Sequence, residues 1–98
     1  SGPSCSTAAP VLQVPAWPLL EGDEVTLHCR VMQKESYPVV NFYHNGKRLW
    51  WHFIGTEMSL SPLQLHDSGH YHCSVRRMSR TSAAVTVTVH GEHPHTSA

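Results

Sequence analysis

The segment LHDSGHYHCS, residues 65–74, concentrates side chains that could bind a metal ion. It contains three histidines and one cysteine, and imidazole and thiolate groups are ligands that zinc prefers. His70 and His72 are two residues apart, so on a strand they share one face and could reach a common ion. Two imidazoles do not complete a tetrahedral site, and Cys73 belongs to the opposite face. We therefore expect solvent-facing histidines, with no metal ion and no other cofactor.

The same segment holds the residue types of a hydrolytic triad. His66, Asp67 and Ser68 follow one another, but a triad depends on spatial geometry, and three consecutive residues in a turn do not supply it. The isolated glycines Gly46 and Gly55 do not form a phosphate-binding loop either. The sequence predicts turn chemistry here and no enzymatic activity.

Composition limits the class of protein. The 98 residues suffice for one domain, and 40% apolar with 14% charged residues is typical of a globular chain. Seven basic residues balance seven acidic residues, so no overall field favours nucleic acid or an anionic membrane. Apolar runs are too short for a membrane span or the centre of a signal peptide. We expect no contact of this segment with nucleic acid or membrane.

Alternating apolar residues indicate several short strands. Residues 25–31 (VTLHCRV), 70–75 (HYHCSV) and 83–90 (AAVTVTVH) each place apolar side chains on one face. Asn45-Gly46 lies between two extended runs, which is a strong hairpin signal. No segment shows a helical period. The pattern favours an all-β sandwich.

The three cysteines occupy two kinds of sequence. Cys29 and Cys73 lie within alternating apolar segments, whereas Cys5 lies in SGPSCSTAAP, which has no regular pattern. A bridge between Cys29 and Cys73 would close a loop of 44 residues and would stabilise the fold by about 4 kcal/mol in the chain-entropy model. Such a bridge implies an oxidising compartment.

Cys73 also ends the run DSGHYHC, which matches the Asp-x-Gly-x-Tyr-x-Cys signature of the immunoglobulin fold. In that fold the tyrosine, here Tyr71, donates its hydroxyl hydrogen to upstream backbone in a tyrosine corner. Gly69 permits a tight approach, and Asp67 can accept backbone hydrogen bonds at the turn. These matches indicate structural roles for the run.

Longer segments carry a closer resemblance. PVLQVPAWPLLEGDEVTLHCRV, VNFYHNGKRLWW, TEMSLSPLQLHDSGHYHCS and AAVTVTV together resemble the membrane-proximal, second-type immunoglobulin domain of Fc receptors and Fc receptor-like proteins, from about Val11 to Val89. Phe42, thirteen residues after Cys29, fits this group, because its domains commonly lack the strand C tryptophan of antibody domains. The resemblance implies a C2-type immunoglobulin-like β-sandwich of two antiparallel sheets joined by a Cys29–Cys73 disulfide.

The resemblance also implies domain boundaries and a location. We expect a flexible lead-in at residues 1–9, the immunoglobulin-like domain at residues 10–90, and a flexible tail or linker at residues 91–98. A receptor ectodomain of this family is extracellular, either on the cell surface or secreted. Its partners would be a protein ligand, including immunoglobulin Fc, and neighbouring immunoglobulin-like domains of the parent chain.

In Fc-binding relatives, contact is made by loops that correspond here to residues 32–38, 49–55 and 76–82. Two tryptophans of those relatives clamp an Fc proline, and the corresponding positions here are Ala9 and Met32. Because neither position holds a tryptophan, the resemblance does not extend to the Fc clamp.

Two groups of side chains remain candidates for protein binding. Aromatic residues are enriched at binding hot spots, and guanidinium groups suit carboxylate-bearing surfaces. The candidates are Trp50, Trp51, His52, Phe53, Arg76, Arg77 and Arg80. For the tryptophans, the alternative is that the sandwich or a neighbouring domain covers them. For the arginines, the alternative is a charged loop that only contacts solvent. Trp17 is expected to pack against the domain.

The sequence thus predicts a non-catalytic recognition or spacer domain of an Fc receptor-like protein. One alternative is a homophilic adhesion or structural immunoglobulin domain. A further alternative is a metal-binding or pH-sensing domain based on its nine histidines.

Overall fold

The computed structural model describes residues 9–31, 39–49, 53–76 and 80–91, with the backbone alone at Phe53 and Ile54. Ten short strands and one 3₁₀ helix occupy these ranges: β1 (Val11–Gln13), β2 (Leu19–Leu20), β3 (Val25–Arg30), β4 (Val40–His44), β5 (Lys47–Leu49), β6 (Phe53–Ile54), β7 (Glu57–Leu60), η2 (Leu65–Asp67), β8 (Gly69–Val75), β9 (Val85–Val87) and β10 (Val89–His90). Within the described ranges no helix is long and apolar enough to cross a membrane.

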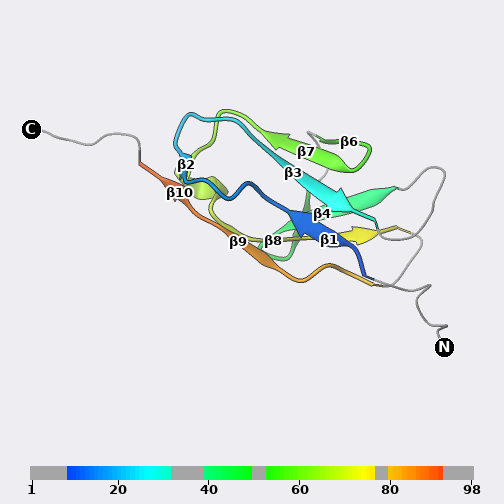
Figure 1. Ribbon diagram of the computed structural model, residues 1–98. Coiled ribbons are helices and arrows are strands. Elements are labelled where there is room, and N and C mark those ends of the chain that lie inside the picture. Colours follow the sequence, from blue (N-terminus) through cyan, green and yellow to red (C-terminus); the bar gives the residue numbers. More distant parts are fainter. Residues whose placement is uncertain (1–8, 32–38, 50–52, 77–79, 92–98) are drawn as a thin grey trace, which may run out of the picture.

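Two four-stranded antiparallel sheets form the layers of a sandwich (Figure 1). One has the order β1-β3-β7-β6 and the other β5-β4-β8-β9. A parallel pair, β10 with β2, lies at one end, where Val89 is opposite Leu19. The predicted all-β sandwich with two antiparallel sheets is confirmed.

The alternation in the sequence determines which face of each strand is buried. In β3, Val25, Leu27 and Cys29 are buried while Thr26 and Arg30 are exposed. The two faces of a strand alternate with a period of two residues, so apolar side chains at every second position point to one side. Each sheet therefore presents one apolar face to the other.

The predicted hairpin joins β4 to β5. Asn45 and Gly46 have φ angles of 52° and 86°, the left-handed region that a type I′ turn requires at both central positions. Asn tolerates this region and Gly has no Cβ to oppose it. The turn fixes the register, with Tyr43 opposite Arg48 and Phe42 opposite Leu49.

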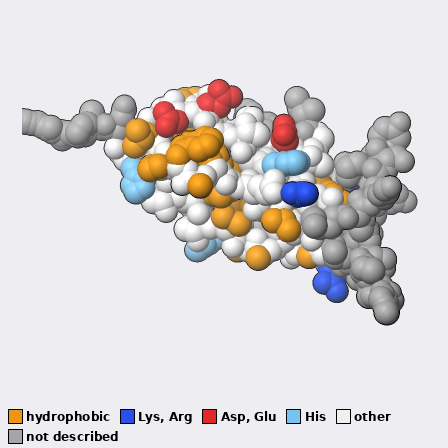
Figure 2. Space-filling view, in the orientation of Figure 1, with side chains coloured by type: hydrophobic (Ala, Val, Ile, Leu, Met, Phe, Trp, Pro, Cys, Tyr) orange, Lys and Arg blue, Asp and Glu red, His pale blue; other side chains and the backbone are white. Residues whose placement is uncertain are grey.

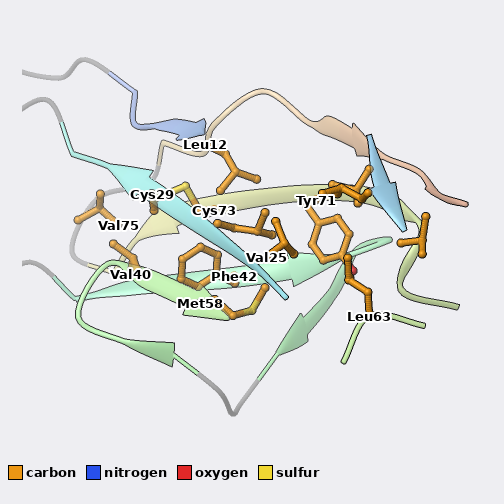
Figure 3. Close-up of a cluster of buried hydrophobic side chains, with 14 residues drawn as sticks. Leu12, Val25, Cys29, Val40, Phe42, Met58, Leu63, Tyr71, Cys73 and Val75 are labelled. Atoms are coloured by element: carbon orange, nitrogen blue, oxygen red, sulfur yellow. A yellow bond between two sulfur atoms is a disulfide. The ribbon is translucent and has the colours of Figure 1, made fainter. Parts of the chain in front are cut away.

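The core lies between the two sheets and contains the predicted disulfide (Figure 3). Cys29 and Cys73 are bonded, with their Cα atoms 6.1 Å apart, so the bridge links β3 of one sheet to β8 of the other. Phe42 is fully buried in the same cluster, and Met58 lies beside it. Fully burying such side chains contributes about 1.5 to 3 kcal/mol each.

Candidate protein-binding surface

The run from Asp67 to Tyr71 forms the predicted tyrosine corner. The Tyr71 hydroxyl donates to the backbone carbonyl oxygen of Asp67 at 2.5 Å, and the Tyr71 ring is buried. Burial, and secondly the Asp67 carboxylate, raise the pKa of the Tyr71 phenol above its ordinary value. Asp67 Oδ2 accepts a hydrogen bond from the Gln64 backbone N–H at 2.8 Å, so this carboxylate holds η2 in place.

Gly69 lets the β4–β5 hairpin approach β8. Its φ angle is 144°, and a Cβ built there would lie 2.6 Å from Asn45 Oδ1 and 2.7 Å from His44 Nε2. The same Asn45 Oδ1 accepts a hydrogen bond from the His70 backbone N–H at 2.9 Å. A larger residue would displace this contact, so the glycine is required by close approach as well as by conformation.

The histidines of the segment have different neighbours. His70 Nδ1 lies 3.1 Å from the Thr86 hydroxyl, whereas the His72 ring stacks on Tyr43 with a centroid separation of 4.4 Å. His70 is exposed and His72 is half-buried. Within the described ranges, no three His, Cys, Asp or Glu side chains are grouped to hold a metal ion.

Asp67 and Ser68, but not the exposed His66, make hydrogen bonds that hold the turn. The Ser68 hydroxyl accepts a hydrogen bond from the Val89 backbone N–H at 2.9 Å and so ties the turn to β10. His66 Nε2 lies 3.8 Å from Asp67 Oδ1 with its side chain mostly exposed. These contacts stabilise the turn, as predicted for this segment.

The loop between β8 and β9 has a firmly held base. Ser74 is opposite Thr81 in an isolated bridge, and the buried Ser82 hydroxyl accepts a hydrogen bond from the Cys73 backbone N–H at 2.9 Å. The backbone N–H of Arg76 donates to the Val39 carbonyl oxygen at 2.7 Å. Arg76 therefore leaves the sheet from a fixed position.

Two of the candidate residues that the structure describes lie at this loop. Arg76 and Arg80 are both exposed, so their guanidinium groups are available to a partner. Phe53 begins β6 and is opposite Met58. The remaining candidates, Trp50, Trp51, His52 and Arg77, lie outside the described residues.

Trp17 does not pack as expected. Trp17 is 64% exposed, and hydrophobic side chains gather on the surface over the connection between β1 and β2 (Figure 2). The physical reason is local: Pro15 and Pro18 flank a bend at residues 16 and 17, so Trp17 lies outside the strand alternation that buries Leu19. The prediction that Trp17 packs against the domain was wrong.

A pocket that sequence reasoning missed opens between the sheets near the tyrosine corner. Its volume is about 370 Å³, and its apolar lining includes Leu49, Met58, Leu60 and Tyr71. These residues come from β5, β7 and β8, so only the tertiary pairing of the strands brings them together. No local pattern in the sequence signals such a pocket.

The fold, the bridge and the tyrosine corner together define an immunoglobulin domain. A family model described as the immunoglobulin domain matches residues 9–89. The chain is 38% identical over 85 residues to human Fc receptor-like A, covering 81% of this chain and 24% of that protein. It is 32% identical to mouse low affinity immunoglobulin gamma Fc region receptor II, covering 83% of this chain and 25% of that protein.

A solved structure agrees with these relatives in fold. The second Ig-C2 domain of human Fc receptor-like A superposes with a TM-score of 0.70 at 21% identity, covering 86% of this chain and 99% of that one. The chain therefore belongs to the Fc receptor and Fc receptor-like family of immunoglobulin domains, as a non-catalytic C2-type domain. It spans about a quarter of the length of the curated relatives named above.

Proposed function

We propose that this domain is a protein-recognition module of an Fc receptor-like protein. The supporting observation is the exposed arginine pair, Arg76 and Arg80, at the firmly based β8–β9 loop. A fixed loop base limits the entropy lost on binding, and guanidinium groups pair well with carboxylates. The relatives named as immunoglobulin Fc receptors make immunoglobulin Fc the first ligand to test.

The candidate surface comprises the arginines of this loop together with the segment Trp50 to Phe53. Charge on the loop would steer the encounter, and an exposed aromatic side chain would slow dissociation. Neighbouring immunoglobulin-like domains of a parent chain are proposed as further partners. The disulfide in a domain related to Fc receptors supports an extracellular location, because such bridges persist in oxidising compartments.

Fc affinity should be low in this chain. The positions of the two clamp tryptophans hold Ala9, which is half-buried, and Met32, which lies outside the described residues. An alanine offers no aromatic wall for a proline, so a large part of the usual contact area is missing.

Restoring the clamp tests this interpretation. The double variant Ala9→Trp, Met32→Trp should bind immobilised Fc at least about tenfold more tightly than the unchanged domain, since a buried aromatic contact contributes more than 1.4 kcal/mol. Ala16→Trp is the matched control, because it adds a tryptophan at an exposed position away from the clamp. Equal gains in the two proteins would contradict the proposed correspondence with Fc receptors.

A further inference from the structure

The connection between β1 and β2 leaves apolar side chains on the surface. Ala16, Trp17, Pro18 and Leu20 are all exposed. Trp17, at 64%, is the most exposed large hydrophobic residue in the part of the chain that the structure describes. Figure 2 shows hydrophobic side chains gathered over this connection. Because tryptophan is enriched among the residues that dominate protein–protein contacts, an exposed tryptophan with apolar neighbours is a candidate anchor for a partner.

The backbone of residues 16–24, hereafter the Trp17 surface, is fixed at several points. The Leu20 backbone N–H donates to Asp23 Oδ2 at 3.2 Å. The Gly22 N–H donates to the Leu63 carbonyl oxygen, and the Leu63 N–H donates to the Asp23 carbonyl oxygen, both at 2.8 Å. Pro18 restricts the backbone next to Trp17. A surface held in this way loses little entropy when a partner binds.

Three carboxylates lie beside the apolar part of the Trp17 surface. Glu21, Asp23 and Glu24 are all exposed, and Figure 2 shows acidic side chains next to the hydrophobic area. Among the described residues none of the three forms an ion pair. The surrounding segments, residues 9–29 and 53–75, contain no Lys or Arg. Although the whole chain has a formal net charge of zero, this surface has a negative potential that favours a basic partner.

We propose that the Trp17 surface binds a protein segment in which an apolar side chain is flanked by lysines or arginines. The apolar side chain would cover the exposed indole of Trp17 and remove both from water. The flanking cations would pair with Glu21 and Glu24, or lie over the face of the indole ring. The same carboxylates repel an acidic protein surface and a nucleic acid.

This surface lies far from the loop of the proposed recognition function. Leu63, which is bonded to the Trp17 surface, precedes η2 and the start of β8. Arg76 follows the other end of β8, so the two surfaces lie toward opposite ends of that strand (Figure 1). The inference therefore goes beyond the proposed function and does not depend on it, since a domain with two separate surfaces can contact two partners at once.

The test is a titration of the isotope-labelled 98-residue chain with a short, end-capped peptide of lysines around one central leucine. NMR of the backbone and indole N–H groups is recorded at neutral pH and low salt. Saturable shifts are expected at residues 16–24 and at the Trp17 indole, whose signal is identified by its loss in Trp17→Ser. These shifts should weaken as salt rises. Peptides with glutamates in place of the lysines, or with serine in place of the leucine, should not saturate the surface.

Variants separate the apolar from the charged contribution. Trp17→Ser should weaken the affinity for the lysine–leucine peptide at least about tenfold, as expected for a tryptophan hot spot. Val39→Ser is the matched control, because Val39 is also exposed but precedes β4 and lies away from residues 16–24. Glu21→Gln combined with Glu24→Gln should weaken the affinity about threefold and reduce its salt dependence. Glu57→Gln removes the same type of charge from an exposed position on β7 and should have little effect.

Several results would overturn the inference. They are an absence of saturable shifts at residues 16–24, equal binding of the lysine and glutamate peptides, and an equal loss of affinity in Trp17→Ser and Val39→Ser. Phosphatidylcholine vesicles that shifted the Trp17 indole signal when the peptide did not would assign the surface to lipid instead. A dimer detected by sedimentation and dissociated by Trp17→Ser would assign the surface to a second copy of the chain.

Discussion

The ring of His44 lies flat against the ring of Tyr71, with centroids 4.3 Å apart and planes within 6° of parallel. His44 Nε2 also donates to the Ser68 carbonyl oxygen at 2.8 Å. The hairpin that carries His44 and the turn that precedes Tyr71 are therefore held together at the tyrosine corner. We expect this corner to be among the most sensitive points of the fold.

Removing the Tyr71 hydroxyl should destabilise the domain. Tyr71→Phe keeps the ring but leaves the half-buried Asp67 carbonyl without its donor, so the free energy of unfolding should fall by about 1 to 2 kcal/mol. Urea denaturation measures this change. Tyr43→Phe, on the outer face, is the control and should have little effect. An unchanged midpoint in Tyr71→Phe would contradict the corner.

Tyr71 should also make stability fall at alkaline pH. Its pKa is raised in the folded protein, whereas tyrosine in the unfolded chain ionises near pH 10. The folded state therefore retains a proton that the unfolded state releases. The contribution of Tyr71 is complete below about pH 10 and is lost as the pH rises above it.

The measurement compares the free energy of unfolding of the unchanged domain and of Tyr71→Phe at increasing pH. Above about pH 10, the unchanged domain should lose up to about 1.4 kcal/mol per pH unit more than the variant. Parallel pH profiles would show that Tyr71 titrates alike in the folded and unfolded states.

Gly69 should not tolerate a side chain. Gly69→Ala places a Cβ against Asn45 and His44 and adopts a positive φ, so thermal or urea unfolding should show a loss of about 1 to 3 kcal/mol. Gly91→Ala is the control, because a Cβ there meets nothing within 4 Å. Equal stability of the two variants would contradict the close approach of the hairpin.

The exposed Trp17 should contribute little to folding. Trp17→Ser is expected to change the free energy of unfolding by less than about 0.5 kcal/mol, since surface substitutions rarely do more. The value can be measured by urea denaturation followed by far-ultraviolet circular dichroism. A loss above about 2 kcal/mol would restore the packing interpretation.

Much of the fold follows from local patterns. The alternation in residues 25–30, the Asn45-Gly46 turn and the run from Asp67 to Cys73 each correspond to an observed element. These signals depend on neighbours within a few positions of the chain, because strand periodicity and turn conformation are local properties.

Other features depend on pairing between distant segments. The Tyr43–His72 stack exists because β4 and β8 pair in one register, and the parallel pairing of β10 with β2 joins opposite ends of the chain. Register is set by the whole sheet, so no single segment predicts which polar residues meet. The burial of Trp17 could not be predicted for a related reason. It depends on the path of the proline-flanked bend between β1 and β2, which strand alternation does not determine.

The most direct test of the recognition proposal is the association rate of Fc with the domain at low and at high salt. We expect weak binding whose association slows when Arg76, Arg77 and Arg80 are changed to Glu, most strongly at low salt, because charge steering is screened over about 10 Å at 0.1 M. Trp17→Ser, which leaves the loop unchanged, should bind as the unchanged domain does. Sub-micromolar binding that was insensitive to the arginine changes would contradict the account and place the site on another face.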